Sequence, residues 1–152
     1  MAGTYTKIYI QIVFAVWGRE NVIGSTWEKE LYKYIAGIIK DKGHKPIIVN
    51  GMPDHIHAFI GLNPSMAISD LVRDIKSNSS GFIKRENFMR QQFCWQEGYG
   101  GFSYSASQVS DIYNYILYQK SHHQRRSFKD EYLEFLDTFE VPYDERYLFE
   151  FY

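Results

Sequence analysis

The chain has 152 residues, which suits one compact domain with a substantial core. Its content of 45% hydrophobic and 18% aromatic residues excludes a disordered polar chain, and no apolar run reaches the ~18 residues of a membrane span. The single cysteine, Cys94, excludes an internal disulfide and a thiolate zinc centre. Because the first residues lack the charged-then-apolar pattern of a secretion signal, we expect a cytoplasmic protein.

The net charge of −1 hides an uneven distribution of charge along the chain. From Asp130 onward there are eight acidic residues and one base, Arg146, so residues 1–129 keep 16 bases and 10 acids, a net charge of +6. A moderately basic body followed by an acidic segment is compatible with nucleic acid binding on the body.

The first third of the chain predicts a strand followed by a helix. Residues 4–17 are mostly β-branched and aromatic, which is typical of a strand with one well-buried face. Ser25 or Thr26 can cap the helix that follows, in which apolar side chains recur at spacings of three and four. Lys42 and Gly43 end this helix.

The middle of the chain predicts a hairpin and a second helix. Residues 46–50 and 55–62 form two strands joined by the turn residues 51–54. The apolar spacing from residue 68 to 83 predicts an amphipathic helix, although residues 77–81 (Ser-Asn-Ser-Ser-Gly) are unusual in a helix interior and suggest a break or a contact site.

The remaining third predicts a fourth strand and two further helices. Residues 93–105 are rich in aromatic residues and glycine, and indicate a strand with a loop or bulge. Helices are expected over 107–123 and about 127–138. The order strand, helix, strand, strand, helix, strand predicts an α+β domain with the ferredoxin-like split βαβ arrangement, a central antiparallel sheet and extra C-terminal helices. We expect one domain over residues 1–152, in which 129–152 form an acidic, aromatic C-terminal extension.

Two histidines stand two residues apart at the start of the third predicted strand. A strand places residues i and i+2 on one face, so His55 and His57 would project to the same side. Two neutral imidazoles side by side are half of a metal site. On this motif alone, a pair of strand histidines hydrogen-bonded to neighbouring groups is an open alternative.

A second pair lies on the third predicted helix. Tyr115 and Gln119 are four residues apart, so one helical face would carry a phenol and a carboxamide together. Packing of a half-buried tyrosine is the alternative interpretation of this pair.

Taken in order, these stretches resemble the single-tyrosine HUH transposases of the IS-two-hundred-like family, which includes the REP-associated tyrosine transposases. The resemblance covers most of the chain, through five segments: 14–19 (FAVWGR), 53–57 (PDHIH), 71–80 (LVRDIKSNSS), 95–103 (WQEGYGGFS) and 115–123 (YILYQKSHH). One departure is Gly18, at a position where the family often has a lysine after the first strand, and it puts a DNA contact there in doubt.

The resemblance implies a metal-dependent enzyme that cuts and rejoins single-stranded DNA at hairpins. It implies that His55, His57 and Gln119 bind Mg²⁺ or Mn²⁺, and that Tyr115 is the nucleophile that forms a 5′-phosphotyrosine. It also implies a homodimer, in which the histidines of one subunit commonly meet the tyrosine helix of the other.

Several further residues are candidates for supporting roles. Asp54 can orient an imidazole as a carboxylate behind the metal ligands, or can serve the turn in which it lies. Residues whose side chains can pair with phosphate or stack on bases are candidates for DNA contacts, with packing or solvation as the alternative. They are Lys76, Lys84, Arg85, Trp95, His122 and Arg125.

Two other functions remain open from the sequence. One is a non-catalytic module that binds single-stranded nucleic acid, since ferredoxin-like sheets with exposed aromatic residues also recognise RNA. The other is a structural dimer whose aromatic C-terminus forms the interface. Covalent attachment to hairpin DNA distinguishes the enzyme from both.

Overall fold

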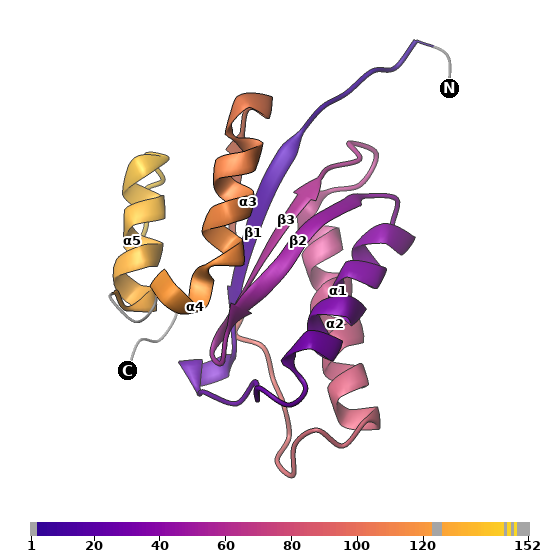
Figure 1. Ribbon diagram of the computed structural model, residues 1–152, viewed down its shortest axis with the longest axis vertical. Helices are drawn as coiled ribbons and strands as arrows, with labels where there is room; N and C mark the ends of the chain where they lie inside the picture. The colour runs from indigo at the N-terminus through magenta and orange to yellow at the C-terminus, as the bar shows by residue number, and fades with distance from the viewer. Residues whose placement is uncertain (1–2, 123–125, 145, 147, 149–152) are drawn as a thin grey trace.

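The computed structural model describes residues 3–122, 126–144, 146 and 148, which form a sheet with helices on both faces (Figure 1). The sheet has four antiparallel strands in the order β2-β3-β1-β4. The α+β, ferredoxin-like fold expected from the sequence is confirmed. The strands are β1 (Tyr9–Ala15), β2 (Lys45–Met52), β3 (His55–Gly61) and β4 (Gly100–Tyr104). The helices are α1 (Glu28–Asp41), α2 (Ile68–Arg85), α3 (Val109–Leu117), α4 (Gln119–His122) and α5 (Phe128–Thr138), with short 3-10 helices at Trp17–Arg19 and Ala106–Gln108.

One face of the sheet carries the larger core. The helices α1 and α2 cover this face, while α3, α4 and α5 lie on the opposite side (Figure 1). Alternate residues of β1, such as Ile12 and Phe14, pack with Ile56 of β3 and with the apolar faces of α1 and α2. The second core, on the α5 side, is smaller and includes Val13 and Phe102. Because side chains alternate along a strand, β1 and β3 each contribute to both faces.

The helix α2 is continuous, contrary to the break suggested by residues 77–81. The hydroxyl groups of Ser79 and Ser80 donate back to carbonyl groups one turn earlier, at Lys76 and Ser77. Such bonds satisfy the serine side chains without interrupting the helical backbone.

Three predicted elements are shorter or divided in the structure. The first strand spans Tyr9–Ala15 within the expected 4–17, and of the expected 93–105 only Gly100–Tyr104 forms β4, with an isolated bridge between Trp95 and Val16. The helix expected over 107–123 is interrupted at Tyr118, which separates α3 from α4.

A polar contact from β2 holds this interruption against the sheet. Asn50 Nδ2 donates to the carbonyl oxygens of Ile116 and Leu117, at 2.9 and 3.3 Å, near the end of α3. Asn50 is also the cross-strand partner of His57. The end of the tyrosine helix is therefore fixed directly beside the histidine strand.

Candidate active site

The two histidines lie on the α5 side of the sheet and are fully buried. Their partners on the central strand are Ala15 and Val13, so both imidazoles project from the middle of the sheet. The tight connection before His55 requires a glycine at position 51, because a Cβ there would collide with the carbonyl oxygen of His55. The ring of Phe128, from α5, stacks on His55 with a centroid distance of 3.9 Å.

Each imidazole is oriented by a polar group at Nδ1. His55 Nδ1 lies 2.7 Å from Asp54 Oδ1, and His57 Nδ1 lies 2.7 Å from Gln11 Oε1. The amide of Gln11 is itself oriented, because its Nε2 donates to Tyr104 Oη at 2.8 Å. Since a carboxylate and an amide oxygen only accept, Nδ1 is the protonated nitrogen of each neutral ring and Nε2 carries the lone pair.

Burial keeps the His55 ring neutral. It lowers the pKa of His55 to about 4, against the opposing effect of the hydrogen bond that the ring donates to Asp54. A neutral imidazole is the form that binds a metal ion.

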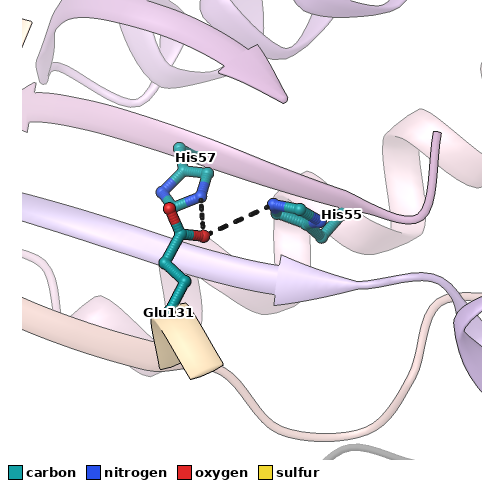
Figure 2. A group of neighbouring side chains, drawn as sticks. All are labelled: His55, His57 and Glu131. Atoms are coloured by element: carbon teal, nitrogen blue, oxygen red, sulfur yellow. Dashed lines mark hydrogen bonds and ion pairs between the residues drawn. The ribbon is translucent and has the colours of Figure 1, made fainter. Parts of the chain in front are cut away.

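The two Nε2 atoms face a carboxylate from α5, that of Glu131 (Figure 2). Glu131 Oε1 lies 3.2 Å from His57 Nε2 and 3.7 Å from His55 Nε2, and the side chain is 1% exposed. The three groups have ligand atoms within 4.8 Å of one another, close enough to hold one metal ion.

The other carboxylate oxygen of Glu131 contacts Tyr115 and Gln119. The Tyr115 hydroxyl donates to Glu131 Oε2, and Gln119 Nε2 donates to the same oxygen at 3.2 Å. The predicted tyrosine, glutamine and histidines are thus brought together in space, although α3 and α4 are separate helices. Within this chain, α3 and α4 contact β2 of the same sheet.

The carbonyl oxygen of Gln119 is the unusual atom of the site. It is buried and has no hydrogen-bond partner within the described part of the chain. A buried polar atom of this kind requires an explanation, such as a bound ion. Two imidazole nitrogens, a carboxylate oxygen and an amide oxygen are together a suitable donor set for a divalent cation, so the residues fit such a metal.

The Tyr115 phenol is protonated at neutral pH. Burial raises its pKa above the ordinary value of 10.0, and Glu131 raises it further, whereas Arg126 opposes the shift. Arg126 Nη2 donates to the phenolic oxygen at 3.2 Å and pairs with Glu134. Beside this group lies a cavity of about 370 Å³, whose lining includes Tyr104, Ile112, Phe135 and Phe139.

The candidate DNA contacts on α2 lie away from this site. Lys76, Lys84 and Arg85 belong to α2, on the opposite side of the sheet (Figure 1). Lys76 Nζ donates to the carbonyl oxygens of Gln96 and Gly98, at 2.8 and 2.6 Å. Lys84 is exposed, and the guanidinium of Arg85 donates to the Tyr34 hydroxyl.

Trp95 packs in the core, which favours the packing alternative for this residue. It is 7% exposed, its Nε1 donates to Ser79 Oγ at 2.9 Å, and its ring meets Phe14 and Phe93 edge-on. Arg125 and the side chain of His122 lie outside what the structure describes.

The backbone conformation at position 18 explains why this residue is a glycine. Gly18 has a φ of +66°, a conformation that favours glycine over lysine, and its N–H donates to Gln96 Oε1.

Three residues of the site were missed by the sequence analysis: Gln11, Asn50 and Glu131. Gln11 is a polar residue within an apolar strand, a pattern that indicates a buried hydrogen-bonding role. Glu131 stands between Phe128 and Phe135 at helical spacing, so it interrupts the apolar face of α5. An acidic residue at such a position must find buried partners.

Comparison with known families identifies the chain. Residues 4–119 match the family model described as "Transposase IS200 like". The chain belongs to this transposase family. The match extends through the histidine pair, Tyr115 and Gln119, and confirms the resemblance drawn from the sequence.

Solved structures of transposases share the fold. A putative transposase from Deinococcus radiodurans superposes with a TM-score of 0.64 at 22% identity, covering 78% of this chain and 95% of the other. A REP-associated tyrosine transposase, solved bound to a REP hairpin, gives a TM-score of 0.60 at 16% identity, covering 81% of this chain and 73% of the other. No curated protein sequence matches the chain. In the described part of this transposase, no helix is both long and apolar enough to span a bilayer.

Proposed function

We propose that this transposase cuts and rejoins single-stranded DNA through a 5′-phosphotyrosine on Tyr115, and that it recognises DNA hairpins. One observation carries the proposal: the Tyr115 hydroxyl and the Gln119 amide converge with the two histidines on a single buried carboxylate. Recognition of hairpins is supported by the similar fold of the transposase that was solved with a REP hairpin.

The residues of the candidate site would have separate roles in strand cleavage. His55, His57 and Gln119 would hold Mg²⁺ or Mn²⁺, which when bound polarises the scissile phosphate and screens its negative charge. The cavity beside Tyr115 is lined by Phe135 and Phe139, whose rings can stack on a base of the strand. Arg126, which already contacts the phenolic oxygen, is placed to stabilise negative charge on that oxygen or on phosphate.

The cleavage step exchanges one phosphodiester for another. The phenolic oxygen of Tyr115 bonds to phosphorus while the bond from phosphorus to the 3′ oxygen breaks. The phenolic proton passes along its hydrogen bond to Glu131, and the leaving 3′ oxygen takes a proton from solvent water to become a 3′-OH. Because the phosphotyrosine is itself a phosphodiester, a later 3′-OH can attack it and rejoin the strand without ATP.

Replacement of the nucleophile tests the proposal. Tyr115→Phe should abolish the covalent protein–DNA adduct formed with single-stranded hairpin DNA and Mn²⁺, as observed on a denaturing gel. Hairpin affinity should stay within about a few-fold, since phosphate contacts elsewhere dominate binding.

Tyr118→Phe is the matched control, because Tyr118 is a neighbouring tyrosine that is 57% exposed. It should form the adduct normally. An adduct formed by the Tyr115→Phe variant would refute Tyr115 as the nucleophile. The homodimer implied by the resemblance also remains a proposal, which a measurement of mass in solution tests.

A further inference from the structure

We propose that Glu131 is itself a ligand of the divalent ion and that the same carboxylate holds the nucleophile, so that ion binding and the position of Tyr115 are coupled. The coupling rests on the proposed function, because it takes Tyr115 as the nucleophile. The ligand role stands on the chemistry of the described side chains, and its test needs no DNA.

Glu131 Oε1 faces the Nε2 atoms of both histidines. Asp54 and Gln11 place the ring protons of the two histidines on Nδ1, so both Nε2 atoms direct lone pairs toward this oxygen. They lie 3.7 and 3.2 Å from it. Three electron-rich atoms thus face one another in a region with almost no solvent contact.

These ligand atoms lie within 4.8 Å of one another, close enough for one divalent cation to bind all three. A proton on one imidazole, by contrast, is shared between only one nitrogen and the carboxylate. The carboxylate also supplies the negative charge that a site made only of two imidazoles and an amide lacks.

The second carboxylate oxygen sets the orientation of the remaining groups. Glu131 Oε2 accepts from Gln119 Nε2, and the amide is thereby turned so that its carbonyl oxygen is the atom left for the ion. The same oxygen accepts the hydrogen bond of the Tyr115 hydroxyl. A single side chain of α5 therefore links the ion, the glutamine and the phenol.

The rival role for Glu131 is that of a latch. In that case its carboxylate would occupy the place of the ion as the partner of a protonated histidine, and ion binding would have to displace it. The two roles predict opposite effects of neutralising Glu131. If the carboxylate is a ligand, its neutralisation weakens ion binding; if it is a latch, its neutralisation strengthens ion binding.

Titration with Mn²⁺, followed by the electron paramagnetic resonance signal of the free ion, decides between them. The protein without DNA is compared with Glu131→Gln, which keeps the shape and removes the charge, and with Asp137→Asn. Asp137 is exposed on the same helix and gives the same change in net charge. We expect Glu131→Gln to weaken Mn²⁺ binding at least about ten-fold, and Asp137→Asn to leave it unchanged.

Equal or tighter binding of Mn²⁺ by the folded Glu131→Gln protein would overturn the proposal. Circular dichroism establishes folding, and if Glu131→Gln does not fold, Glu131→Asp replaces it. This shorter carboxylate should bind Mn²⁺ more weakly than the unmodified protein, and undiminished binding would again overturn the proposal. Because no DNA is present, this result is independent of the adduct experiment with Tyr115→Phe. If Glu131→Gln loses Mn²⁺ binding while Tyr115→Phe still forms the adduct, Glu131 is a ligand and Tyr115 is not the nucleophile.

Discussion

The two faces of the sheet are built from the same strands, but one forms the main apolar core and the other carries the candidate active site. On the α1/α2 face, buried side chains such as Ile12, Phe14 and Ile56 are apolar and pack against two long helices. On the α3–α5 face, the same strands present Gln11, His55 and His57, which are buried among hydrogen-bonding partners. The larger core allows the other face to bury polar groups, which by themselves contribute little net stability. The alternation of side chains in a strand allows the two requirements to be met independently.

The largest expected effect is on the apolar face. Phe14→Ala removes a fully buried ring that contacts Trp95, and should lower the free energy of unfolding by about 3–5 kcal/mol, as measured by chemical denaturation. The Mn²⁺ affinity of the protein that remains folded should be unchanged, because Phe14 points away from the histidines. A loss of stability below about 1 kcal/mol would contradict the assignment of this face as the principal core.

An intermediate effect is expected on the site face. Gln11→Leu removes the acceptor of His57 Nδ1, and should weaken Mn²⁺ binding about 10–100-fold. The free energy of unfolding should fall by about 1–3 kcal/mol, since a buried N–H loses its partner. Calorimetric titration with Mn²⁺ measures the first quantity and chemical denaturation the second.

Gln11→Glu is the matched variant, because it keeps an oxygen that can accept from His57. Its affinity for Mn²⁺ should lie closer to that of the unmodified protein than to that of Gln11→Leu. If both variants bind Mn²⁺ normally, the orientation of His57 does not depend on Gln11.

The smallest effect separates packing from DNA contact on the α2 side. Trp95→Phe keeps a buried ring but loses the hydrogen bond from Nε1 to Ser79 Oγ, and should cost about 1 kcal/mol of stability. Hairpin affinity, measured by a gel shift, should not change, because the ring lies in the core. Weakened hairpin binding in a protein of normal stability would instead make Trp95 a DNA contact.

Local patterns were enough to predict the architecture. The β-branched and aromatic runs, the turn at residues 51–54 and the helical apolar spacing led to the ferredoxin-like order of elements. The pair His55 and His57 could be predicted for the same reason, because two residues on one strand have a fixed geometric relation. Local preferences misled at residues 77–81, where serine hydroxyls bond back to their own helix.

Local sequence patterns therefore predicted the fold class, the family resemblance and the residues within each element that could share a face. Only the tertiary structure decided that Glu131, which lies 74 residues from His57 in an acidic segment, is a buried part of the site, and that Trp95 belongs to the core. The physical reason is that spacing along one strand or helix fixes neighbours within that element alone. Which charged or aromatic side chain is withdrawn from solvent depends on how α5 and the segment before β4 dock onto the sheet, and that docking is set by packing between residues distant in the sequence.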